Sequence, residues 1–409
     1  MKFFFADSVD VVDPSFDFDA ESRSRDRVRH RSDAYAHEVF TARAYNGLLV
    51  SKGIVDTGRY SIAQRHRLLR IGAKDFFRTA SVGWGELEIM GDCGAFTYVK
   101  EERPPVSVDE VLQFYTDCDF DYGISLDHVI LSYQPDWDSP GSGLPRAVRE
   151  RQELTLALAA EFFRKSVRGR VRFVPLGVAQ GWSPKSYCRA VRVLQKIGYR
   201  YIALGGMVPL KTREILECLD AIDEVRRSDT KLHLLGVTRL EHFDKFLRYG
   251  VVSFDSTSPL RQAFKDADDN YYTPHRNYTA IRVPQIEGNA RLQKLILSGE
   301  IPQREARKRE QACLIALRQF EARELSVDET LEVLLRYEEL HDPKRNHREA
   351  YHEILSDRPW TLCECDVCKR LGYHVALFRG AERNRRRGFH NLWVFYHRLQ
   401  RELGAGESK

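Results

Sequence analysis

The chain has 409 residues, of which 43% are hydrophobic and 30% charged, with a formal net charge of +5. This composition excludes a disordered chain, and the absence of any run of about 18 apolar residues excludes a transmembrane helix. The small net charge neither requires nor excludes a nucleic-acid partner. The N-terminus reaches Asp7 too early for a signal peptide, so the sequence predicts a cytoplasmic protein with no membrane partner.

Short apolar segments recur through the first 260 or so residues, and their lack of alternation is typical of strands buried on both faces. We expect eight strands: Phe3–Phe5, Gly47–Ser51, Leu87–Gly91, Gly123–Val129, Arg172–Val178, Tyr201–Leu204, His233–Gly236 and Val251–Phe254. Helical patterns separate most of them: Ser61–Ile71, Val108–Tyr115, Arg146–Arg164, Pro184–Ile197, Thr212–Ile222 and Leu240–Tyr249. This rhythm predicts an α/β fold, a (β/α)8 TIM barrel. A doubly wound open sheet is the alternative, disfavoured because no Gly-x-Gly-x-x-Gly follows the first strand.

The rest of the chain departs from this rhythm. We expect the catalytic barrel to occupy residues 1–264 and a charged helical insertion to occupy residues 265–360, beginning with a polar loop at Lys265–Pro284. Residues 361–409 form a zinc-binding module that ends in an amphipathic helix. Within the barrel, Gln134–Pro145 is rich in Pro, Gly and Ser and predicts a loop, and Ser107 with Glu110 indicates a capping box.

Polar residues and glycines follow several strands at the end where barrel active sites form. Asp92, Asp127 and Asp255 supply carboxylates, Gln180 an amide, and Gly205-Gly206 a place where a backbone can approach a flat ligand closely. A single Asp after a strand is often only a helix cap or turn residue. Three carboxylates at one end of the barrel indicate catalysis, because burial and mutual repulsion separate their pKa values. One carboxyl group can then act as a nucleophile and another as a general acid/base. Such a pair suits substitution at an anomeric carbon.

Three cysteines within six residues predict a metal site. A closed tetrahedral set of four ligands is typical of structural zinc. We expect this set to consist of Cys363, Cys365, Cys368 and His390. His374 is the alternative fourth ligand, although it lies in an apolar stretch, and a redox role of the thiols is the alternative chemistry.

Arginines cluster in two runs. Arg23, Arg25, Arg27, Arg29 and Arg31 fall on alternate positions, and a second group lies near the C-terminus: Arg379, Arg383, Arg385, Arg386 and Arg387. A solvated face is the ordinary explanation, but the preference for Arg favours phosphate contact. The candidate nucleic-acid contacts are Arg23, Arg25, Arg27, Arg261, Arg385, Arg386 and Arg387.

These motifs resemble, in order, those of the tRNA-guanine transglycosylase superfamily. The matching segments are Gly91–Phe96 (GDCGAF), Ser125–His128 (SLDH), Val178–Gly181 (VAQG), Ala203–Met207 (ALGGM), Val251–Ser256 (VVSFDS) and the zinc module with His390–Leu392. The resemblance covers roughly residues 85–264 and 361–400.

The resemblance implies a role for each matched position. Asp255 is the expected nucleophile toward C1′ of the nucleotide, and Asp92 the general acid/base. Asp127 and Gln180 are expected to bind the polar edge of the base, with Gly205, Gly206 and the Met207 backbone on its other side. Phe96 and Leu235 are expected to sandwich the ring, and the incoming base is expected to be a 7-deazaguanine.

Departures from the common pattern point to the DNA-modifying branch, the 7-deazaguanine DNA transglycosylases. Ala95 and His128 replace a Gly and a Glu, Pro209 follows the Gly pair closely, and Ser258–Arg261 only loosely echoes the family's Leu-Pro-Thr-Arg. About 108 positions separate Asp255 from Cys363, through the helical insertion. The opening Phe3–Phe18 also looks like that branch, which exchanges guanine in DNA for 7-cyano-7-deazaguanine.

The leading hypothesis is therefore a DNA-guanine transglycosylase with structural Zn²⁺. A tRNA-guanine transglycosylase with the same chemistry is the alternative. A catalytically inactive barrel serving as a nucleic-acid-binding or scaffold protein is disfavoured by the three aspartates, and an ordinary glycosidase by the zinc module. Because the insertion carries charges of both signs, the sequence does not distinguish DNA from a partner protein, such as an ATPase, as its binding partner.

Overall fold

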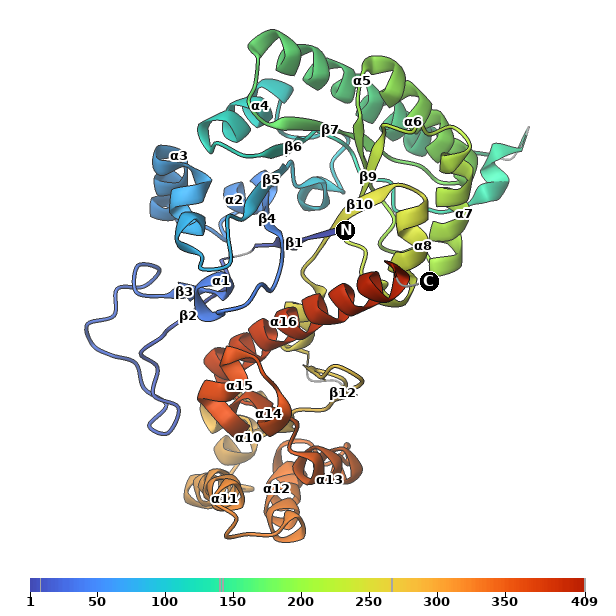
Figure 1. The fold of residues 1–409 in the computed structure, drawn as a ribbon. Helices are drawn as coiled ribbons and strands as arrows, with labels where there is room; N and C mark the ends of the chain where they lie inside the picture. Colours follow the sequence, from blue (N-terminus) through green and yellow to red (C-terminus); the bar gives the residue numbers. More distant parts are fainter. Residues whose placement is uncertain (8, 140, 142, 266–267, 408–409) are drawn as a thin grey trace. The chain divides into compact units, whose positions relative to one another are not determined.

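The computed structural model describes residues 1–7, 9–139, 141, 143–265 and 268–407 (Figure 1). The chain groups into two compact units. The first comprises Met1–Val9, Tyr45–Thr257 and Arg398–Lys409, and the second Asp10–Ala44 and Ser258–His397. The division predicted at residues 264 and 360 remains a prediction. Among the described residues, no helix is both long and apolar enough to cross a membrane.

The first unit is a closed barrel, as predicted. Within the described residues, eight parallel strands pair in the order β1-β10-β9-β8-β7-β6-β5-β4. They are β1 (Lys2–Ala6), β4 (Gly47–Ser51), β5 (Glu88–Asp92), β6 (Tyr122–Ile124), β7 (Val174–Ala179), β8 (Tyr201–Leu204), β9 (Lys231–Leu234) and β10 (Val251–Ser256). The ring closes where Phe4 pairs with Asp255 on one side and Gly47 on the other.

Helices follow the strands and cover the outside of the barrel, as α5, α6 and α7 show in Figure 1. They are α2 (Lys52–Asp56), α3 (Ile62–Phe76), α4 (Val108–Asp117), α5 (Arg146–Gly169), α6 (Pro184–Ile197), α7 (Thr212–Asp223) and α8 (Phe243–Arg248). Ser107 and Glu110 form the predicted capping box at the start of α4. Ser61 and Gln64 form another at the start of α3.

The fourth strand is shorter than predicted. The apolar run Gly123–Val129 predicts a seven-residue strand, but the ladder of β6 ends at Ile124. The Ser125 amide still donates to the Leu176 carbonyl on β7 (2.8 Å), but farther along, side chains become the partners of the backbone. The His128 amide donates to Thr155 Oγ1 (3.0 Å) and the Ile130 amide to Gln180 Oε1 (3.1 Å). The segment therefore stays buried without being a strand, and it is free to shape a site.

The interior of the barrel is filled by apolar side chains, as in other barrels of this size. The buried cluster consists of Phe4, Leu49, Met90, Ile124, Leu176, Val178, Tyr201 and Ala203. Burial of each large side chain contributes roughly 1.5–3 kcal/mol. Because this core fills the interior of the barrel, a ligand can bind only at an end of the barrel, outside the core.

The second unit combines short strand pairs with helices. The strands are β2 (Val11–Val12) with β3 (Ala34–Tyr35), β11 (Tyr271–Tyr272) with β12 (Asn277–Tyr278), and β13 (Ile281–Arg282) with β14 (Leu377–Phe378). The helices are α1 (Ala36–Val39), α9 (Ser258–Gln262), α10 (Ala290–Leu297), α11 (Gln303–Glu321), α12 (Val327–His341), α13 (Arg348–Asp357), α14 (Pro359–Leu362), α15 (Asp366–Leu371) and α16 (Gly380–Glu407) as far as His397, since its residues from Arg398 belong to the first unit. Part of the predicted polar loop at Lys265–Pro284 thus forms strands.

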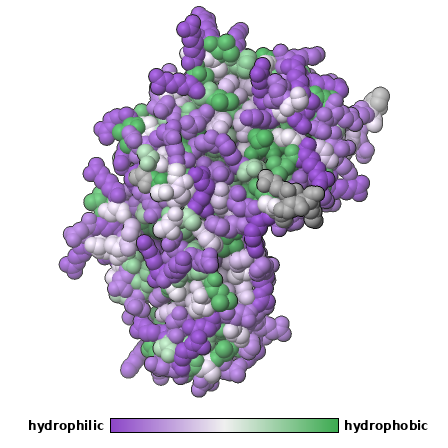
Figure 2. Space-filling view, viewed as in Figure 1, coloured by the Kyte–Doolittle hydropathy of each residue, from purple (hydrophilic) through white to green (hydrophobic). Residues whose placement is uncertain are grey.

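The face shown in Figure 2 is mostly hydrophilic, with small, separate apolar patches.

Candidate active site

A small cavity of about 100 Å³ lies at the carboxyl ends of the barrel strands. Its lining residues are Leu49, Asp92, Ala95, Phe96, Asp127, Val129, Gln180, Gly205, Gly206, Leu235, Gly236 and Asp255. Eight of the nine residues predicted to bind or transform the substrate are among them. The ninth, Met207, is fully buried and is not part of the lining that the described residues form. Leu49 belongs both to the lining and to the barrel core, so the cavity sits directly on the core.

Asp92 ends β5 and is held by short local contacts. Its Oδ2 accepts a hydrogen bond from the Gly94 amide (3.0 Å), and Ser51 donates to the same carboxyl group. Gly94 has a φ of +87°, and a Cβ there would lie 2.7 Å from the Gly53 backbone, so only glycine fits this turn. Burial, with the charges of Asp127 and Asp255, raises the pKa of Asp92 to about 7. The carboxyl group can therefore give up or take a proton near neutrality.

Asp127 lies in the irregular segment after β6 and both of its oxygens are bonded. The Cys93 thiol donates to Oδ1 (3.0 Å) and the Gln180 amide to Oδ2 (2.7 Å). The Tyr98 hydroxyl donates to the Asp127 carbonyl (3.1 Å), which fixes the backbone as well. Burial raises the pKa of Asp127. The result is a rigid acceptor in the wall of the cavity.

Gln180 explains the glycine pair in a way that the sequence did not. Its side chain lies against the backbone after β8, where a Cβ on Gly205 would be 2.2 Å from its Nε2. A Cβ on Gly206, whose φ is +74°, would be 2.3 Å from the Ile130 carbonyl. The sequence predicted that the glycines admit a flat ligand. In this structure Gly205 makes room for the Gln180 amide and Gly206 for the Ile130 carbonyl, while the approach of a flat ligand remains a prediction.

Asp255 lies within β10 and is 8% exposed. Its Oδ1 accepts a hydrogen bond from the Gly236 amide (3.0 Å) and lies 3.2 Å from His233 Nε2. The backbone of Gly236, with a φ of +71°, reaches this orientation without strain. Asp255 thus presents a carboxylate to the cavity from a regular strand, a rigid support for a reacting group.

Phe96 and Leu235 contribute apolar walls from two different strand ends. Phe96 lies on the short turn Ala95–Tyr98 and is 56% exposed, and Leu235 directly follows β9. An exposed aromatic ring at a cavity rim is suited to stacking on a flat ring system. The predicted sandwich of a base between these two residues remains a prediction.

The sequence missed several residues that support the site: Ser51, Cys93, Tyr98, His233 and Ser253. Two of them carried a usable signal. His233 lies on β9, two residues before Leu235, which directly follows that strand, and Ser253 lies on β10 two residues before Asp255. Because strand side chains alternate, each faces the same side as its predicted neighbour.

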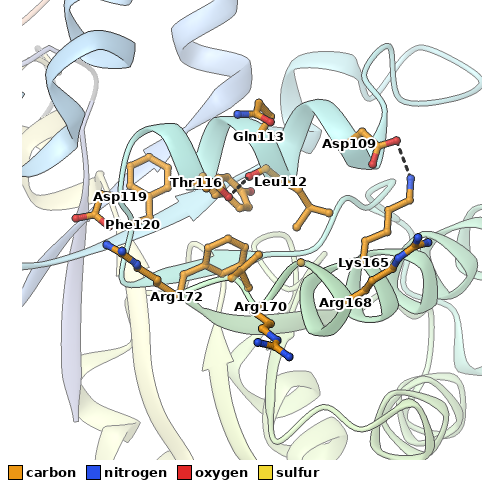
Figure 3. Close-up of a pocket in the computed structure, with 14 residues that line it drawn as sticks. Asp109, Leu112, Gln113, Thr116, Asp119, Phe120, Lys165, Arg168, Arg170 and Arg172 are labelled. Carbon is orange, nitrogen blue, oxygen red and sulfur yellow. Dashed lines mark hydrogen bonds and ion pairs between the residues drawn. The ribbon is translucent and has the colours of Figure 1, made fainter.

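A larger cavity, of about 910 Å³, lies between α4 and α5 (Figure 3). It is lined by Lys165, Arg168, Arg170 and Arg172 among others, and Lys165 pairs with Asp109 (2.7 Å). Its residues 170–173 precede β7, so it lies at the amino ends of the strands. No residue predicted to carry chemistry lines it. Size alone therefore does not identify the site, and the strand-end cavity remains the candidate.

A separate cluster in the second unit can hold a metal ion. The ligand atoms of Cys363, Cys365, Cys368 and His390 all lie within 4.8 Å of one another. His390 Nδ1 is 3.6, 3.3 and 3.3 Å from the three sulfurs in that order. Tetrahedral zinc, with Zn–S of about 2.3 Å and Zn–N of about 2.0 Å, puts such ligand atoms roughly 3.5 Å apart. The donor set and its spacing fit zinc.

Neighbouring residues orient this cluster. His390 Nε2 lies 2.7 Å from the Tyr272 carbonyl, and donation to it leaves Nδ1 free to face the sulfurs. The Tyr271 ring stacks on His390 with a centroid separation of 4.4 Å. His374, the alternative ligand, instead stacks on Tyr373 and lies 3.4 Å from the Arg383 guanidinium. It is not among the described residues that form the cluster.

The arginines predicted to contact nucleic acid fall into two groups. Arg23, Arg25 and Arg261 are exposed and Arg27 and Arg385 partly so, although Arg23 pairs with Glu382 (3.0 Å) and Arg27 with Asp33 (2.7 Å). Arg386 and Arg387 are buried inside the second unit.

Burial argues against DNA contact for this second group. Arg387 donates to the carbonyls of Leu377 (2.7 Å) and Ala263 (2.6 Å), and Arg386 pairs with Glu382 (2.6 Å). A guanidinium whose donors are used internally cannot reach a phosphate. Arg386 and Arg387 therefore stabilise the fold of the second unit, and the structure does not support the prediction that they contact nucleic acid.

Comparison with known proteins provides two relatives. No model of a protein family matches the chain. It is 48% identical over 412 aligned positions to the DNA-guanine transglycosylase of Salmonella montevideo, an alignment covering 98% of this chain and 97% of that protein. It is 24% identical over 230 positions to the tRNA-guanine(15) transglycosylase of Thermococcus onnurineus (strain NA1), covering 54% of this chain and 36% of that protein.

The raised pKa of Asp92 predicts a pH-dependent stability change in Asp92→Asn. The folded protein holds the Asp92 proton up to about pH 7, whereas the unfolded chain loses it near 3.8, so wild-type stability falls across that window. Asparagine does not titrate. Between about pH 5 and about pH 8, Asp92→Asn should therefore gain roughly 2–3 kcal/mol in free energy of unfolding relative to wild type. Urea titrations at both pH values, with exposed Asp26→Asn as control, measure this. A difference independent of pH would contradict it.

The metal cluster predicts that Cys365→Ser lowers bound zinc and thermal stability, because metal binding contributes to folding. The matched control is His374→Gln, which changes the alternative ligand and should leave zinc content unchanged. Metal content per chain by mass spectrometry, together with thermal melts, checks both variants. Full zinc occupancy in Cys365→Ser, or its loss in His374→Gln, would refute the assigned ligands.

Proposed function

Because the chain belongs to the DNA-guanine transglycosylase family, we propose that it exchanges guanine in DNA for a 7-deazaguanine, with 7-cyano-7-deazaguanine as the expected base. The observation that carries this proposal is the convergence of Asp92, Asp127 and Asp255 in one small cavity at the barrel mouth. A cavity of this size receives a single base. The target guanine therefore leaves the duplex, at an unstacking cost of a few kcal/mol.

The cavity supports recognition of the flipped base by its edge and its faces. Asp127 offers carboxylate oxygens and Gln180 an amide group, which suit the donors and acceptors of a guanine edge. Phe96 and Leu235 offer apolar contacts to the ring faces. Since Asp127 is already held by Cys93 and Gln180, little reorganisation is needed when the base binds.

The first step forms a glycosyl-enzyme. The Asp255 carboxylate attacks C1′, a C1′–O bond forms, and the C1′–N9 bond breaks with its electron pair leaving on guanine. Asp92 gives its proton to the departing purine and becomes a carboxylate. A pKa of about 7 allows Asp92 to carry that proton near neutral pH.

The second step reverses the first with a new base. The incoming 7-deazaguanine loses its N9 proton to the Asp92 carboxylate, its nitrogen attacks C1′, and Asp255 departs as a carboxylate. Two displacements at one carbon give retention of configuration. Protons and electron pairs balance within the two steps, so no redox cofactor or ATP enters the reaction.

Zinc, held by Cys363, Cys365, Cys368 and His390, would supply a structural cross-link because the four ligands leave no open position. Arg23 and Arg25 are exposed and are candidates to contact the DNA backbone. Helices α10–α13, of mixed charge, are candidates for contact with DNA or with a partner protein such as an ATPase.

An exchange assay tests the substrate class. Radiolabelled guanine is offered with plasmid DNA and with bulk tRNA in parallel. We expect label to enter DNA and not tRNA, because the relative that aligns along almost the whole chain is named for DNA. Label entering tRNA alone would establish the tRNA-modifying alternative and contradict the proposal.

Asp255→Asn should abolish the covalent complex with DNA and reduce exchange by a factor on the order of 10³ or more, because an amide is a poor nucleophile. Denaturing gels of protein incubated with labelled DNA report the complex. Asp7→Asn is the matched control, since Asp7 also follows a barrel strand but does not line the cavity. A complex that persists in Asp255→Asn would remove Asp255 as the nucleophile.

A further inference from the structure

We infer that His233 is a positioning residue for the reaction, holding Asp255 through a hydrogen-bond relay that crosses the barrel interior. The inference rests on the proposed function, since it assigns a task within the same two displacements. The relay connects Asp255, His233, Ser253 and Tyr201, which lie on β8, β9 and β10.

Three hydrogen-bond contacts define the relay. His233 Nε2 lies 3.2 Å from Asp255 Oδ1, and His233 Nδ1 lies 2.6 Å from Ser253 Oγ. Ser253 Oγ in turn lies 2.5 Å from the Tyr201 hydroxyl. His233 and Ser253 are fully buried, and Phe4 packs edge-on against the imidazole at 6.1 Å. The imidazole is therefore confined within the barrel core.

For a neutral His233 imidazole, the chemistry of the four groups sets the direction of every bond. An Asp255 carboxylate can only accept, so His233 Nε2 carries a proton and donates it. In a neutral imidazole the other nitrogen then accepts, and the Ser253 hydroxyl donates to Nδ1. Ser253 Oγ accepts from the Tyr201 hydroxyl. Each hydroxyl donates once, and the relay selects one tautomer of His233.

The relay distinguishes the two oxygens of Asp255. Oδ1 receives both the Gly236 amide and His233 Nε2, while no group of the described residues donates to Oδ2. Oδ2 is thereby assigned as the attacking atom, and Oδ1 becomes the carbonyl oxygen of the glycosyl ester. When Asp255 departs in the second step, the electron pair of the C1′–Oδ2 bond leaves on Oδ2 and carboxylate resonance shares the charge with Oδ1, where two donors are already in place.

A merely structural histidine would behave differently. A buried imidazole needs hydrogen-bond partners in any protein, and its loss lowers stability wherever it lies. A positioning residue affects, in addition, the rates of the two chemical steps. His233 does not line the base cavity, so its loss should leave the KM for the incoming base unchanged.

Single-turnover kinetics with DNA test this role. His233→Leu removes the donor and should slow both formation and breakdown of the glycosyl-enzyme by roughly 10²–10³-fold, the range for loss of one such donor. His233→Gln keeps an N–H near the Nε2 position and should recover at least about tenfold of that loss. Tyr201→Phe removes only the far end of the relay and should cost less than His233→Leu. The inference would be overturned by wild-type rates in His233→Leu, or by a loss of rate in His233→Gln as large as the loss in His233→Leu.

A second measurement needs no turnover, and its readout comes from the wild-type protein. Nitrogen-15 NMR of the native protein reports the tautomer of each of its 13 histidines, and the His233→Gln spectrum assigns His233. We expect a ring that carries a proton on Nε2, the nitrogen that faces Asp255. A ring protonated on Nδ1 alone would overturn the relay. Wild-type protein that never forms the glycosyl-enzyme would instead contradict the proposed function, so the two failures are distinguishable.

Discussion

The mutual burial of three carboxylates at one barrel mouth is the constraint on which the site depends. Burial disfavours the charged form of the Asp92 carboxyl group, and the charges of Asp127 and Asp255 add to this effect, which is why the pKa of Asp92 rises to about 7. Asp127 and Asp255 are each compensated by hydrogen-bond donors on their own oxygens. Three chemically identical groups are thereby given three environments. A proton carrier, an acceptor and a nucleophile can then coexist within one cavity.

The closed barrel makes this arrangement possible. Parallel strands bring the carboxyl ends of β5 to β10 to one mouth, while the apolar core beneath it excludes water and supports each strand end. The polar relay from Asp255 to Tyr201 passes through that core. Its groups are paired with one another, so burial costs little. The two residues proposed to react, Asp92 and Asp255, therefore lie on strands, which suits a reaction that needs an attacking oxygen held in place.

Much of the fold and most of the cavity could be predicted because their signals are local. Buried strands show as apolar runs, the residues after them line the cavity, and three cysteines within six residues mark the metal cluster. Other features depend on contacts between distant segments. The strand expected at Gly123–Val129 ends at Ile124, and farther on the His128 amide donates to Thr155 and the Ile130 amide, just past the segment, to Gln180, both distant in the chain. The Arg386–Arg387 pair resembles a solvated basic run, yet Arg387 is buried against the Ala263 carbonyl. Local charge patterns do not reveal such partners.

The ionisation of Asp92 in the folded protein tests the central claim most directly. Carbon-13 NMR of aspartate-labelled protein, with Asp92→Asn used for assignment, follows the carboxyl carbon through a pH titration. The account predicts that Asp92 titrates near pH 7, because it is buried beside two other carboxylates. Titration near its ordinary value of 3.8 would show that the three carboxylates are not coupled. It would also remove the physical basis for Asp92 as the proton carrier.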